Sequence, residues 1–98
     1  MVFKIKIDAA AKLDIQEAIN WYNEQQKGLG KKFHKAVLSH FEHLKKNPFF
    51  ENRYDKVHCL PIKKFPFMIH FTVNEKDKLI IVRAVFHTSL NPDIWRDR

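Results

Sequence analysis

The stretch FPFMIHFTVNEKDKLIIVRAVFH, residues 65–87, decides the fold of this chain. It contains two runs rich in Ile, Val, Phe and Thr, Phe65–Val73 and Lys78–His87, separated by the polar tetrad Asn74–Asp77. Such runs joined by a short polar connection are typical of a β-hairpin. We therefore expect two long antiparallel strands here, with the tetrad as their loop.

The alternation of side chains along the two runs predicts which face of this hairpin is buried. The expected pairs are Val73 with Lys78, Phe71 with Ile80, Ile69 with Val82, and Phe67 with Ala84. This register places the apolar rows, including Phe86, on one face, which is expected to be core. The other face has His70, Arg83 and His87 among apolar residues, so any function is expected there or at its rim.

Composition and charge limit the class of protein and of partner. The chain is expected to form a single domain, residues 1–98, around one hydrophobic core. A formal charge of +7 indicates an anionic partner, which can be nucleic acid, an acidic protein or an acidic membrane surface. No apolar run reaches the length of a membrane span. The lone Cys59 cannot form an internal disulfide, so a cytoplasmic location is expected.

The N-terminal part predicts a strand and then a helix. Val2–Ile7 alternates apolar residues with lysines, as in a half-buried strand at or near a sheet edge. Asp8 is placed to cap a helix over residues 9–26. The apolar stripe of this helix is Ala11, Ile15, Ala18 and Tyr22, with Ile19 on its flank. Leu13 points nearly the opposite way, and a single exposed residue is favoured there over a partner-binding patch.

A second helix follows a glycine turn. Gly28-Leu29-Gly30 ends the first helix, and the second helix is expected to stop at Asn47-Pro48. Its stripe is Leu29, Phe33, Ala36, Val37, His40 and Leu44. The two helices form an αα-hairpin whose stripe is expected to cover the inner face of the sheet. A structural role is favoured for His40, and a metal shared with His43 lacks an obvious third ligand.

The remaining segments complete an α+β fold. Tyr54–Ile62 is predicted to be a strand, with Pro61 at a bulge or an edge. Asn91–Arg98 is predicted to form one or two helical turns. The expected architecture is an N-terminal strand, an αα-hairpin, and then antiparallel strands in one sheet with a short C-terminal helix.

The ordered set of these residues resembles the RelE/ParE superfamily of toxins from bacterial type II toxin–antitoxin modules, in particular its ParE-like, plasmid-stabilisation branch. The resemblance runs over nearly the whole chain. It rests on Ala11-x-x-Asp14-Ile15-x-x-Ala18-Ile19, Trp21-Tyr22, Gly28-Leu29-Gly30-x-x-Phe33, Asn47-Pro48, Tyr54, Phe65-Pro66-Phe67-x-Ile69-x-Phe71, Ala84-Val85-x-His87 and Pro92-x-x-Trp95-x-x-Arg98.

This resemblance implies one of two activities. Superfamily members that cleave mRNA on the ribosome use Lys and Arg with a Tyr or His, and no metal. A 2′-hydroxyl attacks the adjacent phosphate, which requires a base, an acid and cations. Many relatives have arginines where this chain has Met68 and Ser89-Leu90, and the C-terminal Tyr of the nucleases is missing. The remaining catalytic candidates are Arg83, His87 and His70, and the further candidate phosphate ligands are Lys63, Lys64 and Arg53.

The segment His87–Asn91 instead resembles ParE toxins that inhibit DNA gyrase by binding. The implied function is a gyrase-inhibiting toxin, neutralised by a cognate antitoxin and needing no cofactor or metal. The alternatives are a ribosome-dependent, metal-independent mRNA endoribonuclease of RelE type, or a toxin fold that retains only antitoxin binding. The residues expected to bind the target or the antitoxin are Lys63, Lys64, Met68, Arg83, His87, Trp95 and Arg98.

Two of these residues also have structural interpretations. A hydrogen bond from His87 to the C-terminal tail is favoured over catalysis, and Arg83 can form an ion pair with the antitoxin or the tail as readily as it contacts phosphate. No sequence-specific DNA binding is expected from this chain alone, because antitoxins of this family usually make the DNA contacts.

Overall fold

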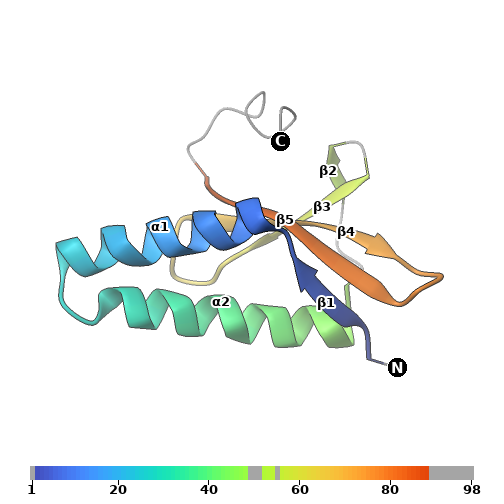
Figure 1. Cartoon of the computed structure of the whole chain (residues 1–98), viewed down its shortest axis with the longest axis horizontal. Helices are drawn as coiled ribbons and strands as arrows, with labels where there is room; N and C mark the ends of the chain where they lie inside the picture. The colour runs from blue at the N-terminus through green and yellow to red at the C-terminus, as the bar shows by residue number, and fades with distance from the viewer. Residues whose placement is uncertain (1, 49–51, 55, 89–98) are drawn as a thin grey trace.

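The computed structural model describes residues 2–48, 52–54 and 56–88 (Figure 1). The elements in this part are β1 (Lys4–Ile7), α1 (Ala9–Gln25), α2 (Leu29–Lys46), β2 (Asn52–Tyr54), β3 (Val57–Pro61), β4 (Phe67–Asn74) and β5 (Leu79–His87). The single strand predicted for 54–62 is therefore two strands. The helix expected over 91–98 lies outside the described residues. None of the described helices is long and apolar enough to span a bilayer.

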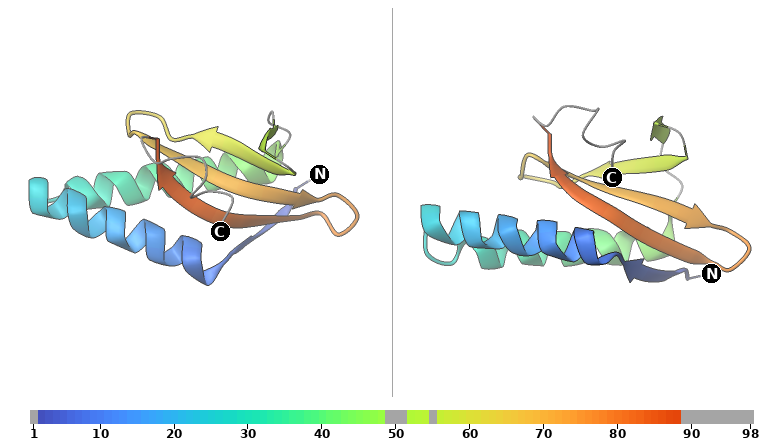
Figure 2. Two further views of the ribbon diagram at one scale, coloured as in Figure 1. Left: turned by 90° about the horizontal axis from the view of Figure 1, so that it is seen from above. Right: turned by 45° about the horizontal axis from the view of Figure 1, so that its top comes forward.

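The five strands form one sheet in the order β1-β5-β4-β3-β2. β1 runs parallel to β5, and the other neighbouring strands are antiparallel. Both helices pack on the same face of this sheet (Figure 2). The predicted α+β architecture is thus confirmed. β1 lies at the sheet edge with Lys4 and Lys6 exposed, as its alternation predicted.

The core lies between the αα-hairpin and the sheet. α1 buries the predicted stripe of Ala11, Ile15, Ala18 and Tyr22, and α2 buries Gly30, Phe33, Val37, Phe41 and Leu44. These side chains pack against Ile69, Phe71, Ile80, Val82 and Val85 of β4 and β5. Phe41 was not in the predicted stripe. Leu13 is 62% exposed, as both interpretations of this residue require.

Two glycines shape the turn between the helices for different reasons. Gly28 has φ +87°, a left-handed conformation that L side chains rarely adopt. At Gly30 the conformation is helical, but a Cβ there would collide with the carbonyl oxygen of Ile19 and lie 2.6 Å from Asn23 Oδ1. The Gly30 N–H also donates to Asn23 Oδ1 at 2.9 Å. The missing side chain at Gly30 therefore sets how closely the two helices approach.

The loop of the β4–β5 hairpin is displaced by one residue from the predicted one. Phe71 pairs with Val82, so the predicted pairing of Phe71 with Ile80 is wrong by two residues. Asn74 is part of the reason, because its Oδ1 accepts the Asp77 N–H at 3.1 Å and its amide donates to the Asp77 carboxylate at 3.0 Å. A shift of two residues preserves the alternation, so both apolar rows next to the loop keep their predicted face.

A β-bulge at Arg83 reverses the predicted faces in the second half of β5. Arg83 is an extra residue that is not paired with any residue of β4. Beyond it, Val85 and His87 are opposite the core-facing residues of β4, whereas Ala84 and Phe86 are on the other face. The predictions that Ala84 and Phe86 face the core and that His87 faces away are therefore wrong. One extra residue in a strand reverses the face on which every later side chain lies. The alternation of apolar and polar residues in the sequence does not show where such a bulge occurs.

Candidate functional site

Arg83 joins two neighbouring elements at the bulge. Its Nη1 lies 3.1 Å from Asp8 Oδ2, and its Nε donates to Thr72 Oγ1 at 3.3 Å. Asp8 occupies the predicted N-cap position of α1, but its side chain makes no capping hydrogen bond. The Arg83 side chain remains 46% exposed. Because so exposed an ion pair contributes about 1 kcal/mol at most, Arg83 can exchange it for an anionic partner at little cost.

His70 is completely buried in the centre of the sheet. Its Nδ1 lies 3.4 Å from Cys59 Sγ, and its ring meets the Phe86 ring edge-on with centroids 5.2 Å apart. Burial lowers the pKa of His70 from 6.5 to about 4, because the charged imidazolium would lose its hydration. His70 is therefore neutral near pH 7, and its ring is closed to a dissolved substrate.

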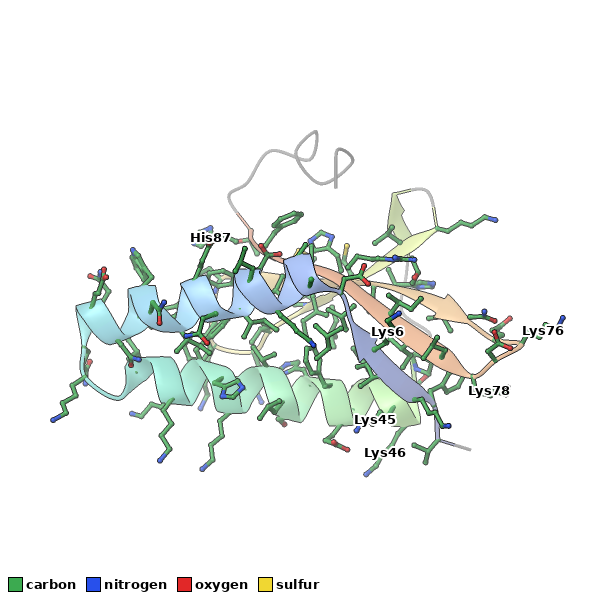
Figure 3. All side chains as sticks on the ribbon, in the orientation of Figure 1. Lys6, Lys45, Lys46, Lys76, Lys78 and His87 are labelled. Carbon is green, nitrogen blue, oxygen red and sulfur yellow. The ribbon has the colours of Figure 1, made fainter. Side chains whose placement is uncertain are left out.

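His87 lies at the end of β5, beside the middle of α1 (Figure 3). Its ring packs edge-on against Phe67, with centroids 5.2 Å apart. With Asp14, Glu17 and Ala18 it lines a cavity of about 260 Å³. The described lining of this cavity contains two carboxylates and no Lys or Arg. Among the described residues, the surroundings of His87 are therefore acidic and aromatic.

The three catalytic candidates consequently occupy three different environments. Arg83 is in an exposed ion pair, His70 is buried beside Cys59, and His87 lines the cavity against α1. Cleavage by 2′-hydroxyl attack requires a base, an acid and cations around one phosphate. The described residues do not gather these three side chains around one open site. Within the described ranges, no group of three or more His, Cys, Asp or Glu could hold a metal ion.

Lys63 and Lys64 are exposed in the turn between β3 and β4. Lys64 has φ 73°, so it occupies the left-handed region that favours glycine. The Lys63 N–H donates to His40 Nε2 at 3.1 Å, while His40 Nδ1 lies 2.6 Å from the Ala36 carbonyl oxygen and must donate to it. His40 is therefore a neutral Nδ1–H tautomer that ties α2 to this turn, which confirms the structural role favoured for it.

The other predicted binding residues are differently placed. Met68 is only 9% exposed in β4, opposite Pro61 and Phe86. Trp95 and Arg98 lie outside the described residues, and the Arg53 side chain is not described either. The described part of the predicted binding surface therefore consists chiefly of Lys63, Lys64 and Arg83.

Asp14 has a structural role that the sequence analysis did not assign. Its Oδ2 accepts the backbone N–H of Val85 at 3.1 Å. β1 pairs with β5 only as far as Val82, so this later N–H faces α1 instead of a strand. Asp14 lies one helical turn from both Ala11 and Ala18 on the buried stripe of α1. A carboxylate beside the apolar stripe of a helix is the signal that could have predicted this partly buried acceptor.

A groove between α1 and α2 was also not predicted from the sequence. It has a volume of about 390 Å³ and is open to solvent. Its lining residues are Ile7 of β1, Lys12, Ile15, Gln16 and Ile19 of α1, and His34, Val37, Leu38 and Phe41 of α2. Leu38 is 47% exposed at its edge. We call this feature the interhelical groove.

Comparisons with known proteins agree with this fold. The family described as "ParE toxin of type II toxin-antitoxin system, parDE" matches residues 5–92. No curated protein matches the chain significantly. Among solved structures, a chain of the chromosomal ParDE system from P. aeruginosa superposes with a TM-score of 0.67 at 20% identity, over 90% of this chain and 98% of that chain.

Two chains from RelE–RelB complexes are similar in fold as well. A chain of the intact RelBE toxin–antitoxin complex from E. coli has a TM-score of 0.68 at 10% identity, over 91% of this chain and 99% of that chain. A chain of the archaeal RelE–RelB complex from Pyrococcus horikoshii OT3 has a TM-score of 0.58 at 16% identity, over 93% of this chain and 100% of that chain. At these sequence identities, the structural similarity shows only a shared fold. The family is shown by the match to the ParE toxin model over residues 5–92. The chain therefore belongs to the ParE toxin family of type II toxin–antitoxin systems.

Proposed function

We propose that this ParE-type toxin acts by binding, that its target is DNA gyrase, and that a cognate antitoxin neutralises it. The observation that supports binding over catalysis is the separation of Arg83, His70 and His87 into three environments. A metal-independent nuclease needs its proton-transferring groups and cations around one phosphate. A binding inhibitor needs only an exposed surface that matches its target.

An acidic antitoxin is the partner that this chain's charge favours. The chain has 18 Lys and Arg against 11 Asp and Glu, which gives a formal charge of +7. An excess of this kind accelerates encounter with an acidic protein and disfavours basic partners. The similar chains from P. aeruginosa and E. coli come from a system and a complex named for a toxin and an antitoxin. We extend that pairing to this chain.

We assign contacts with the partner proteins to the exposed cations Lys63, Lys64 and Arg83. Lys63 and Lys64 project from a tight turn whose backbone is held to α2 by the ring of His40. Arg83 is held between Asp8 and Thr72 yet stays nearly half exposed. Because the Arg83 side chain is already held in place, it loses little conformational entropy when it binds a partner.

Two assays on the purified chain test this proposal. In the first, the chain is added to gyrase and relaxed plasmid, and we expect reduced supercoiling together with DNA breaks covalently linked to gyrase. In the second, the chain is added to translating ribosomes, and we expect the mRNA to remain intact. Cleaved mRNA with unaffected gyrase would instead establish the RelE-type nuclease. Inactivity in both assays, combined with antitoxin binding, would leave a toxin fold that retains only its antitoxin.

A matched pair of variants makes the gyrase assay specific. Arg83→Ala is expected to weaken inhibition several-fold with the fold intact, because the Arg83 ion pair is exposed. Lys27→Ala removes an equal charge from the exposed turn before α2 and is expected to leave inhibition unchanged.

A further inference from the structure

We propose that lysines gathered at one end of the molecule form a surface that binds the phosphate backbone of duplex DNA without sequence preference. We call it the lysine surface, and its members are Lys4 and Lys6 of β1, Lys45 and Lys46 at the end of α2, and Lys76 and Lys78 of the β4–β5 loop. Figure 3 labels five of them, all at the end of the molecule where β1 begins and α2 ends. DNA binding of this kind goes beyond the proposed inhibition of gyrase, because it does not depend on which protein the toxin inhibits.

Backbone hydrogen bonds hold the three segments of the lysine surface together. The Phe3 N–H donates to the Lys45 carbonyl oxygen at 2.8 Å, and the Lys4 N–H donates to the Lys78 carbonyl oxygen at 2.9 Å. The chain at the start of β1 is therefore bonded both to the last turn of α2 and to the β4–β5 loop. β1 is an edge strand, with Lys4 and Lys6 on the sheet face opposite the one that the helices cover. Cations consequently lie on both sides of this sheet edge.

Positive charge is in excess at this end of the molecule. Lys45 is partly exposed, and the other five lysines of the surface are exposed. The acidic residues of the same segments, 2–7, 42–46 and 74–78, are Glu42, Glu75 and Asp77. The Glu42 carboxylate pairs with Lys45 at 3.0 Å, and the Asp77 carboxylate accepts the Asn74 amide at 3.0 Å. Six lysines against three carboxylates leave an excess of positive charge that attracts a polyanion.

The kinds of side chain on this surface favour a phosphate backbone over a protein or a single strand. Lysine is depleted in protein–protein interfaces, where aromatic residues, Met and Arg are enriched. The bases of a single strand would require exposed aromatic rings on which to stack. Phe3 is the aromatic residue of these three segments, and it is only 6% exposed, with Lys78 Nζ 5.3 Å from its ring centroid. Lysines act as point charges on phosphates and therefore position a protein on DNA without reading its sequence.

Duplex DNA suits several lysines at once because it has about one negative charge per 1.7 Å of its axis. Lysines that neutralise these phosphates release condensed counterions, so the binding is strongest at low salt. Contacts of this kind also allow a protein to slide along DNA. If gyrase is the target, the lysine surface would keep the toxin on the polymer on which gyrase works.

A matched pair of triple variants locates the contact. The probe is a fluorescently labelled duplex of about 20 base pairs, titrated with the purified full-length chain at about 50 mM salt and without gyrase. Lys6→Gln, Lys46→Gln and Lys76→Gln together remove one exposed cation from each segment, and we expect the dissociation constant to rise at least about 10-fold. Lys27→Gln, Lys35→Gln and Lys56→Gln remove the same charge from exposed lysines outside the surface, and we expect a change of less than about threefold. Circular dichroism checks that both variants fold.

The salt dependence of binding counts the phosphate contacts. Each contact contributes about 0.9 to the slope of log K against log salt concentration, so the slope should be shallower by about 2.7 in the first variant and nearly unchanged in the second. Equal weakening by the two variants, or no binding of the duplex by the wild type, would overturn the proposal. Tighter binding of a single strand of the same length, or of vesicles containing phosphatidylserine, would also overturn it, because the surface would then serve another anion. None of these results bears on gyrase inhibition, since no gyrase is present in the titration.

Discussion

The imidazole of His70 makes the stability of this fold dependent on pH in a defined window. His70 is 0% exposed, and its pKa falls from 6.5 to about 4 on burial. Between these two values the unfolded chain binds a proton that the folded chain does not bind. Stability therefore rises with pH in this window: the contribution is fully present above about pH 6.5 and is lost as pH falls towards 4.

The size of this effect follows from the two pKa values. Their difference is 6.5 − 4 = 2.5. At about 1.36 kcal/mol per pKa unit, the limiting loss in the free energy of unfolding is about 3 kcal/mol. Less than half of this loss is reached by about pH 5.5 and most of it by about pH 4. Losses of this size are a large fraction of the stability of a small domain.

Urea unfolding at several pH values between about 7.5 and 4 measures this loss. The control is His70→Leu, which removes the titrating ring at similar volume while the other five histidines and the 11 acidic residues stay the same in both chains. We expect the wild type to lose about 3 kcal/mol more than His70→Leu over this range. Equal losses in the two chains, or an NMR titration that places the His70 pKa near its ordinary value, would refute the reasoning.

Three further changes test the packing described above. Gly30→Ala should destabilise the fold by about 2 kcal/mol in urea unfolding. The added methyl group would collide with the first helix and strain the hydrogen bond to Asn23, and this cost outweighs a gain in helix propensity of about 1 kcal/mol. Asp14→Ala should cost about 1.5–3 kcal/mol by the same measurement, since the Val85 N–H loses a charged acceptor, whereas Asp14→Asn should cost less than about 1 kcal/mol. Lys64→Gly should raise the melting temperature by a few degrees, because glycine relieves about 1 kcal/mol of left-handed backbone strain.

Each of these predictions has a result that contradicts it. A stabilised Gly30→Ala chain would mean that the helices separate freely at this point. Equal losses for the two Asp14 variants would mean that the carboxylate acts through its charge and not as an acceptor. A Lys64→Gly chain that melts at a lower temperature would mean that the side chain, and not its backbone conformation, stabilises the turn.

The sequence predicted those parts of the fold that depend on local periodicity. The stripe of Ala11, Ile15, Ala18 and Tyr22 was predicted correctly because a helix repeats every 3.6 residues and the apolar residues follow that repeat. The structural role of His40 was predicted for the same reason, since it lies on the stripe of α2. The buried face of a helix can therefore be predicted from its own sequence, without knowing which element packs against it.

The faces of β5 beyond residue 82 could not be predicted in this way. The bulge at Arg83 depends on contacts from distant parts of the chain: Asp8 pairs with the bulged residue, and Asp14 accepts the N–H of Val85. These residues are 75 and 71 positions away in sequence from their partners. The alternation in β5 continues unbroken through the bulge, so it placed His87 on the wrong face. The face of His87 was mispredicted because tertiary contacts at Arg83 override the local pattern.

The proposed activity of this ParE-type toxin is inhibition of DNA gyrase by binding. The most direct measurement in cells is inducible expression of the chain alone in a bacterial host, with separate pulse-labelling of DNA and protein synthesis. If the toxin inhibits gyrase, DNA synthesis stops first, a DNA-damage response follows, and co-expression of the antitoxin prevents both effects. If protein synthesis stops first and mRNA is cut, the toxin is a nuclease and the proposed gyrase inhibition is wrong.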